Sequence, residues 1–181
     1  GTVYFGDESN QRFFKLGTNG IINHFAGGAS VVDPQGTPAT NLNIPGALSI
    51  TTGPDGSIYV GSGYYFVYKI LTNGLAWKVA GFPHLPFDGA SGDGGCATNA
   101  RFDGPLGLAV AADGTLFIAD SGNHRVRRVG PDGIITTYAG DGTAGHTGDG
   151  GPATNAAVFW PRGLALGPDG ALYIGQYGDH Y

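Results

Sequence analysis

The chain has 181 residues, among them 35 glycines and 11 prolines, and its 14 acidic and 9 basic side chains give a net charge of −5. So many glycines and prolines favour short strands joined by tight turns over helices, while the 41% hydrophobic content excludes a disordered linker. The acidic balance disfavours a nucleic-acid partner, and no apolar run approaches the roughly 20 residues needed to cross a bilayer. We therefore expect an all-β protein with no membrane insertion.

One segment of about 56 residues recurs along the chain. Its most regular part reads small or polar, aliphatic, aromatic, apolar, and finally glycine or alanine, and the copies begin at Thr2, Ser57, Thr115 and Ala171. Internal repeats of this length indicate units that cannot bury their apolar faces alone and therefore stack on their neighbours. Because the repeated unit has the composition of strands, a β-propeller is the predicted architecture.

Taken in chain order, the strand patterns group into four blades. Residues 2–28 supply three strands of a partial blade, residues 43–82 and 103–140 supply four strands each, and residues 162–181 supply two strands and the start of a third. In each full blade, tight turns separate alternating segments and a longer glycine-rich crossover follows. We expect residues 1–181 to form a single propeller segment of four-stranded antiparallel blades, about three and a half of which are present.

The connections predict two unlike rims, because successive antiparallel strands place their connections at alternate ends. Short Asp-Gly and Asn-Gly turns fall on one rim, which we call the turn rim; their glycines are at positions 20, 56, 74, 114, 133 and 170. The connections between second and third strands, together with the long crossovers, fall on the other rim, which we call the loop rim. Function that depends on loops is expected there.

Three segments carry a family resemblance. Residues 118–129 read Ile-Ala-Asp-Ser-Gly-Asn-His-Arg-Val-Arg-Arg-Val, residues 107–114 read Gly-Leu-Ala-Val-Ala-Ala-Asp-Gly, and residues 148–155 read Gly-Asp-Gly-Gly-Pro-Ala-Thr-Asn. Together they resemble the NHL repeat, a family of propeller blades, in copies that cover essentially the whole chain. The resemblance implies a propeller commonly of six blades, in which an Asp on the second strand and an Arg on the third brace each blade.

Two blades match this bracing pair. Asp7 with Arg12, and Asp120 with Arg125, fall at the expected positions, whereas the second blade has Ser62 and Phe66 there. An Asp that ends one strand and an Arg that opens the next can meet across the turn through a bidentate hydrogen bond. We interpret these pairs as structural rather than catalytic.

The number of blades raises the question of closure. Propellers usually have about four to eight blades, so the segment alone does not easily close a ring. Unpaired strand edges are poor endpoints. Either the remainder of a longer chain or self-association of copies completes the ring, and we favour the longer chain.

The second blade has the most individual sequence. Its loop-rim connection and its crossover carry a candidate binding patch for a protein or a carbohydrate, composed of Tyr64, Tyr65, Phe82, Leu85 and Phe87. The alternative is that Phe82, Leu85 and Phe87 fold over the blade edge and replace the missing ion pair. The sequence favours neither interpretation.

Metal chemistry has weak support. The five histidines do not share one register in the repeats, so the sequence encodes no ring of zinc ligands. The recurring Gly-Asp-Gly-Gly motif and nearby carboxylates give weak calcium candidates at Asp88, Asp93, Asp141 and Asp149. Asp93 and Asp149 are more typical of turn formers, and we expect no cofactor.

The predicted function is a non-catalytic interaction or structural module of a secreted or cell-surface protein, such as an adhesin or a subunit of an extracellular fibre. Low lysine content and loops rich in Thr, Ser and Gly suit this environment and leave O-glycosylation open. Cys96 stands where other copies have proline; it is either a spare surface residue or, outside the cell, half of an intermolecular disulfide. The alternative function is a metal-dependent propeller lyase or hydrolase that resembles the peptidyl-α-hydroxyglycine lyases.

Overall fold

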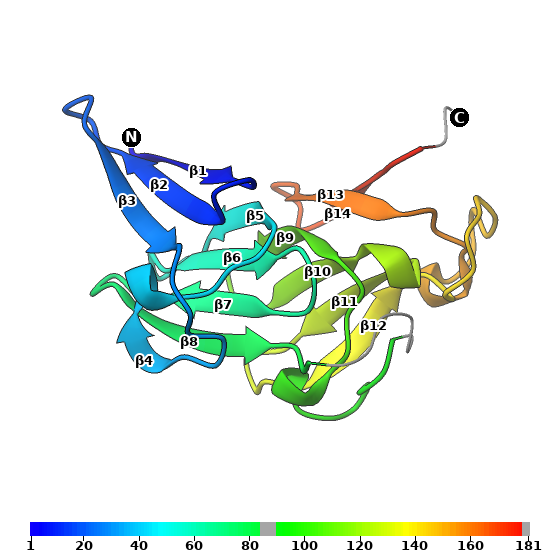
Figure 1. Cartoon of the computed structure of the whole chain (residues 1–181). Coiled ribbons are helices and arrows are strands. Elements are labelled where there is room, and N and C mark those ends of the chain that lie inside the picture. The colour runs from blue at the N-terminus through cyan, green and yellow to red at the C-terminus, as the bar shows by residue number, and fades with distance from the viewer. Residues whose placement is uncertain (84–89, 179–181) are drawn as a thin grey trace.

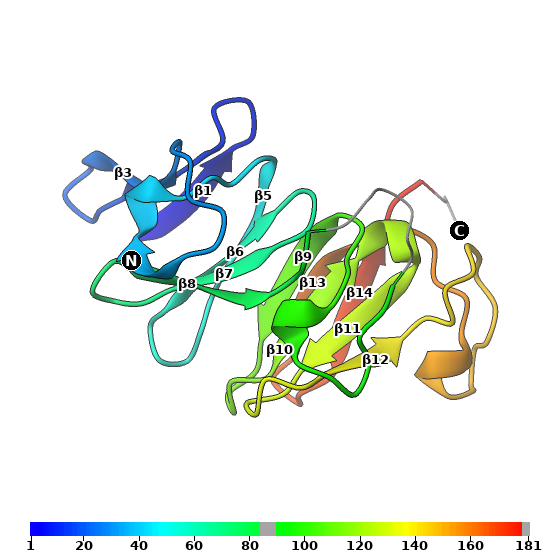
Figure 2. The same cartoon turned by 60° about the horizontal axis from the view of Figure 1, so that its bottom comes forward.

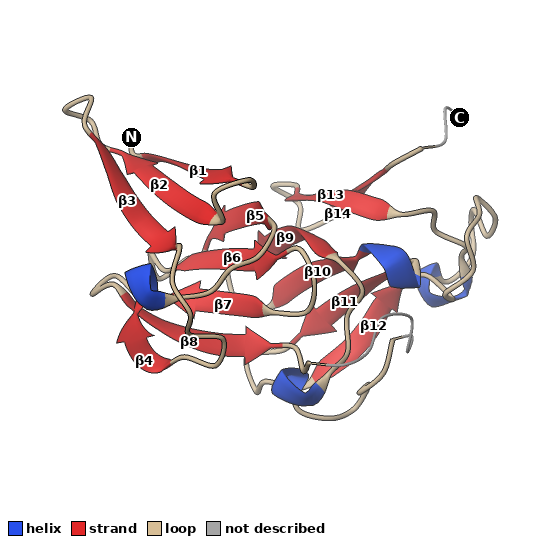
Figure 3. Cartoon of the chain, in the orientation of Figure 1, coloured by secondary structure: helices blue, strands red, loops and turns tan. Residues whose placement is uncertain are grey.

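The computed structural model describes residues 1–83 and 90–178. Within them the chain is all-β apart from four short 3₁₀ helices, as the secondary-structure colouring in Figure 3 shows. The helices are η1 (Ala39–Asn41), η2 (Ala97–Asn99), η3 (Ser121–Asn123) and η4 (Ala153–Asn155). The predicted all-β class is therefore confirmed.

The described strands form four antiparallel sheets, which follow one another in chain order (Figure 1). The first sheet contains β1 (Val3–Asp7), β2 (Arg12–Leu16) and β3 (Ile22–Gly27). The second contains β4 (Gln35–Pro38), β5 (Ala47–Thr52), β6 (Ile58–Ser62), β7 (Val67–Ile70) and β8 (Leu75–Ala80). The third contains β9 (Pro105–Val110), β10 (Leu116–Asp120), β11 (Arg125–Val129) and β12 (Ile135–Ala139), and the fourth contains β13 (Pro161–Leu166) and β14 (Leu172–Gln176).

The sheets pack face against face, and one edge strand of each sheet, β1, β5, β9 or β13, lies on the same side of the molecule. Strand β9 contacts both β5 and β13, and β1 contacts β5, so the inner ends of successive sheets lie side by side (Figures 1 and 2). Successive antiparallel sheets arranged in this way are the blades of a β-propeller. The predicted fold is thus the observed one.

The hydrophobic core lies between the sheets rather than within any one of them. Tyr59 and Val67 of the second sheet pack in one cluster with Phe102 and with Ile118 of the third. A similar cluster joins the first and second sheets, and a smaller one joins the third and fourth. Strands β6 and β10 are buried along their whole length because apolar surfaces cover both their faces. Each blade therefore depends on its neighbours for burial.

Short turns shape the turn rim as the sequence predicts. In each Asp-Gly turn the aspartate carboxylate accepts a hydrogen bond from the backbone N–H two residues later, at Asp55, Asp113, Asp132 and Asp169. The glycine that follows has a positive φ, for example 88° at Gly114. Only glycine adopts this conformation without strain.

The second sheet has a fifth strand that the sequence did not predict. Strand β4 comes from the crossover before the blade and pairs antiparallel with the outer strand β8. The crossover before the third sheet does the same over a shorter stretch: Gly94 donates to the carbonyl of Ile135, and Ile135 donates to that of Gly95. We call these two segments, Gln35–Pro38 and residues 94–97, the edge straps. They cover strand edges that would otherwise expose unpaired backbone groups.

Candidate functional site

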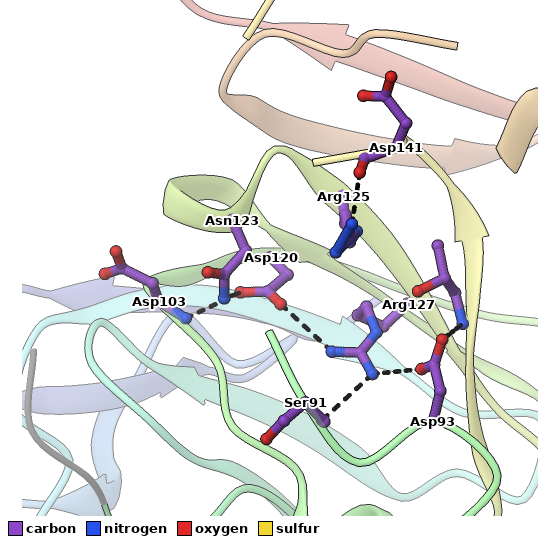
Figure 4. Close-up of polar contacts among 9 residues, drawn as sticks. Ser91, Asp93, Asp103, Asp120, Asn123, Arg125, Arg127 and Asp141 are labelled. Atoms are coloured by element: carbon purple, nitrogen blue, oxygen red, sulfur yellow. Dashed lines mark hydrogen bonds and ion pairs between the residues drawn. The ribbon is translucent and has the colours of Figure 1, made fainter. Parts of the chain in front are cut away.

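The loop rim of the third blade contains a buried ionic network (Figure 4). Asp120 ends β10 and is fully buried. Its carboxylate accepts hydrogen bonds from the backbone N–H of Asp103 at 2.8 Å and from the amide of Asn123 at 2.8 Å, and it pairs with Arg127 at 3.4 Å. Burial raises the pKa of Asp120 to about 6, and these partners partly oppose that increase.

Arg127 links the blade to its edge strap. Its guanidinium is 1% exposed and also pairs with the carboxylate of Asp93, in the crossover that precedes the blade. The Nη2 atom of Arg127, which contacts Asp93, also donates to the carbonyl of Ser91 at 3.4 Å. The carboxylate of Asp93 accepts a hydrogen bond from the backbone N–H of Thr137 at 3.0 Å. The network therefore joins β10, β11, β12 and the crossover, and its role is structural.

The predicted partner of Asp120 was wrong. Arg125 lies opposite Asp120 in the strand register, but its guanidinium donates to the backbone carbonyl of Asp141 in the next crossover. The register shifts between Ala119 and Asp120 on one edge of the sheet and between Val126 and Arg127 on the other. The extra residues at these shifts, Leu106 and Tyr138, lie on β9 and β12, whereas β10 pairs with β11 without a shift. Arg127 is therefore the diagonal neighbour of Asp120 on the same face, and its guanidinium reaches the carboxylate.

The first predicted pair is also corrected. Asp7 accepts hydrogen bonds from the side-chain amide of Asn10 at 2.7 Å and from its backbone N–H at 3.0 Å. These bonds lower the pKa of Asp7, and Arg12 adds a smaller electrostatic contribution. In the part of the chain that the structure describes, no ion pair joins Asp7 to Arg12. Arg12 is exposed and Asp7 is half-buried, so the turn satisfies the carboxylate without the guanidinium.

The residue at the repeat position of Asp120 has a second role that the sequence did not predict: its side chain accepts a hydrogen bond from a backbone N–H that precedes the first strand of the blade. In the fourth blade the side-chain carbonyl of Gln176 accepts the backbone N–H of Phe159 at 2.6 Å, which matches the bond between Asp120 and Asp103. The second blade has Pro45 at the donor position and Ser62 at the acceptor position. Proline has no N–H, so that blade needs no acidic acceptor.

The candidate patch of the second blade is partly described. Tyr64 is 55% exposed and Phe82 is 46% exposed, whereas Tyr65 packs partly against the core. The rings of Tyr64 and Tyr65 are 5.9 Å apart. Leu85 and Phe87 lie outside the described residues. Tyr64 and Phe82 therefore remain candidates for binding, and the structure leaves the role of Leu85 and Phe87 untested.

The calcium candidates do not converge. Asp93 pairs with Arg127, and Asp141 accepts hydrogen bonds from the backbone N–H and the hydroxyl of Thr143 at 2.7 and 2.6 Å. Asp149 is exposed in the same crossover as Asp141, and Asp88 lies outside the described residues. Residues 1–83 and 90–178 contain no group of three or more His, Cys, Asp or Glu side chains that could hold a metal ion. They also contain no helix long and apolar enough to cross a membrane.

The aromatic and histidine residues at the loop rim of the fourth blade were missed. His124 contacts the rings of Phe159 and Trp160, each at 5.8 Å, and Arg162 lies over the ring of Tyr177 at 3.8 Å. A signal was present in the sequence, because alignment of the repeats places Trp160 where two other blades have glycine.

Comparison with known proteins finds similarity to proteins with NHL repeats. A family model described as the teneurin NHL domain matches residues 79–144. Human teneurin-1 is 40% identical over 70 residues, which make up 35% of this chain and 3% of teneurin-1. The chloroplastic protein SUPPRESSOR OF QUENCHING 1 of Arabidopsis thaliana is 26% identical over 164 residues, 86% of this chain and 15% of that protein. The chain thus spans only a small part of the relatives it matches.

Solved structures agree on the fold. A protein of unknown function from Bacteroides thetaiotaomicron gives a TM-score of 0.72 at 21% identity, over 97% of this chain and 42% of that one. A streptogramin B lyase gives a TM-score of 0.62 at 16% identity, over 97% of this chain and 45% of the lyase chain. Identities this low support a shared fold and say nothing about a shared activity.

Proposed function

The chain is a β-propeller segment built of NHL repeats, and from this premise we propose that it is a non-catalytic module that binds a protein partner through the loop rim of its second blade. The observation that carries the proposal is the exposure of Tyr64 and Phe82. The third blade has Gly122 and Asp141 at the same repeat positions. Exposed aromatic side chains are enriched in protein interfaces.

The proposed location is the outside of the cell. The matched family model describes a teneurin domain, and several relatives, one of them 40% identical over 70 residues, are teneurins, which are cell-surface proteins. The chloroplastic relative is less similar but aligns with more of this chain. Fractionation of the source cells, followed by immunoblotting with and without protease treatment of intact cells, separates these locations. Protection of the chain from external protease contradicts the proposal.

We further propose that residues 1–181 are one propeller segment with blades near residues 2–28, 43–82, 103–140 and 162–181. A role as an adhesin or fibre subunit would follow if the partner is another surface protein. Limited proteolysis with mass spectrometry locates the boundaries, because cleavage is expected between the blades rather than within them. Early cuts inside a sheet would contradict these limits.

Binding is tested with variants of the two exposed aromatics. The purified chain is screened against a panel of secreted and cell-surface ectodomains from the source organism, and each hit is measured by biolayer interferometry. Tyr64→Ser and Phe82→Asp are expected to weaken binding at least tenfold. Ile21→Asp removes an equally exposed apolar residue from the turn rim, 54% exposed, and is expected to change nothing. Equal loss in all three variants, or no hit, overturns the proposal.

A further inference from the structure

The loop-rim end of the fourth blade differs from the same end of the other blades. The alignment of the repeats places three side chains of the fourth blade where the second and third blades have glycine, leucine or serine: Trp160 replaces Gly46 and Gly104, Arg162 replaces Leu48 and Leu106, and Tyr177 replaces Gly63 and Ser121. Since the other blades form the same strands without these side chains, the fold does not require them.

Trp160 adopts a backbone conformation that is unfavourable for a large side chain. Its φ is 40°, and the glycines at the same position, Gly46 and Gly104, have φ of 63° and 66°. A left-handed conformation strains every residue except glycine. The repeat therefore sets the backbone, and the fourth blade keeps an indole there in spite of the strain. Strained residues of this kind gather at functional sites.

The surrounding contacts hold Trp160 in one position. Its backbone N–H donates to Nδ1 of His124 at 3.3 Å, and the two rings meet edge to face with centroids 5.8 Å apart. Its carbonyl accepts the backbone N–H of Tyr177 at 3.2 Å. The indole is nevertheless 39% exposed. A fixed aromatic ring with an open face is a good ligand platform, because little conformational entropy is lost on binding.

Arg162 adds a positive charge two residues further along the chain, against Tyr177, whose backbone N–H bonds to the Trp160 carbonyl. Its guanidinium lies over the ring of Tyr177 at 3.8 Å, an arrangement that leaves the edge N–H groups free to donate. Lys69, Lys78 and Arg127 each pair with an aspartate, whereas Arg162 forms no ion pair within the described residues. A stacked, unpaired arginine is suited to bidentate binding of a carboxylate.

We propose that Trp160, Arg162 and Tyr177 form a binding site for a sugar that carries a carboxylate. The face of an aromatic ring is negative and attracts the C–H groups on the flat side of a sugar ring. Arg162 disfavours a cationic ligand, and the net charge of −5 disfavours a long polyanion. The inference rests on the proposed function in treating the chain as a binding module, but it uses none of the residues of the second-blade patch.

The test is calorimetric titration of the purified chain with 3′-sialyllactose and with a hyaluronan tetrasaccharide, both of which carry carboxylates. At least one is expected to bind saturably, and lactose is expected to bind at least tenfold more weakly. Arg162→Leu installs the residue of the two other blades and should weaken binding tenfold or more without changing the melting temperature. Trp160→Gly likewise restores the residue of those blades and should abolish binding.

Controls separate this site from the patch of the second blade. Tyr64→Ser is expected to leave sugar binding unchanged, so that failure of one proposal does not imply failure of the other. Equal affinity for lactose, equal affinity for sodium acetate alone, or no binding of either acidic sugar overturns the inference. If Trp160→Gly does not fold, Arg162→Leu decides, and unchanged affinity in that variant also overturns the inference.

Discussion

At the scale of single residues, the glycines of the inner strands have two different constraints. Gly104 needs a positive φ of 66°, but a Cβ there meets nothing closer than 3.8 Å. Gly107 has an ordinary backbone, but a Cβ there lies 2.1 Å from the carbonyl oxygen of Arg162 in the next blade. One glycine is required for conformation and the other for close packing of two blades.

Alanine substitution separates these constraints. Gly104→Ala should lower the free energy of unfolding by about 1 kcal/mol through backbone strain alone. Gly107→Ala should lower it by about 3 kcal/mol, because the third and fourth sheets must move apart. Urea denaturation of both variants measures the difference. Equal effects would mean that the inner strands are less tightly packed than the structure shows.

Asp120 makes stability depend on pH. Burial raises its pKa to about 6 from 3.8, so the folded state binds a proton more tightly than the unfolded state. Its contribution to stability is full below pH 3.8 and is lost as the pH rises through 6. The stability of the wild type relative to Asp120→Asn should therefore fall by up to about 3 kcal/mol between pH 4 and pH 7.

Urea denaturation of both proteins across this range measures the effect. Asp113→Asn is the control, because hydrogen bonds from Thr115 lower the pKa of Asp113. Its contribution to stability is lost only as the pH falls below the ordinary range of a carboxyl group, so its difference from the wild type should stay nearly flat. If the stability of the wild type relative to Asp120→Asn rises with pH instead, the hydrogen-bond and ion-pair partners of Asp120 lower its pKa by more than burial raises it.

At the scale of elements, an ion pair anchors the crossover next to the edge strap of the third blade, in addition to the strap's own backbone hydrogen bonds. Asp93→Asn removes the charge opposite Arg127 but leaves Asp120 beside the guanidinium. Because the Asp93 side chain is 49% exposed, the expected loss is only about 1 kcal/mol. Hydrogen exchange should become faster at the amides of Thr137 and Ile135, which bond to Asp93 and to the strap.

Asp149→Asn is the matched control. Asp149 occupies the same motif in the next crossover and is exposed, so its replacement should change stability by less than about 0.5 kcal/mol. If exchange at Thr137 is the same in both variants, the strap is held by its backbone hydrogen bonds and not by the ion pair.

Strand prediction worked where the signal is local. The alternating segment at residues 105–111 is β9, and the Asp-Gly turn follows it as expected, because side-chain period and turn chemistry are properties of neighbouring residues. Strand β4 was missed since its sequence, Gln-Gly-Thr-Pro, does not alternate and becomes a strand only against the edge of β8.

The candidate site was harder to predict for the same reason. Asp120 pairs with its diagonal neighbour Arg127 instead of with Arg125, which lies directly opposite, and the spacing in the sequence does not distinguish these two partners. Tyr64 is exposed on a loop whose backbone bonds to the next blade, since the Tyr64 carbonyl accepts the N–H of Gly104, and the sequence does not encode this contact. Trp160 was detectable, because comparison of the repeats alone shows a tryptophan where glycine is needed.

At the scale of the whole molecule, burial between sheets couples neighbouring blades. Phe102 is fully buried in the cluster that joins the second and third sheets. Phe102→Ala should lower the free energy of unfolding by about 3 to 5 kcal/mol and should speed hydrogen exchange in both β6 and β10. Exchange in the first sheet should change much less, because stability in repeat proteins is transmitted mainly between neighbours.

Phe13→Ala should destabilise a different pair of sheets, the first and the second. Phe13 is buried in the cluster between the first and second sheets, so its loss should affect β2 and β6 more than β10. Hydrogen exchange with mass spectrometry compares the two variants. Uniform acceleration over all sheets in both would show that the segment unfolds as one unit.

The edge straps also bear on synthesis of the protein. Each strap precedes in sequence the outer strand that it covers, β4 before β8 and residues 94–97 before β12. On the ribosome, where chains fold from the N-terminus as they emerge, the covering segment is therefore made before the edge. When the outer strand of a blade leaves the exit tunnel, the edge strap that pairs with it has already been synthesised. The exposed edge therefore has little time to pair with another nascent chain.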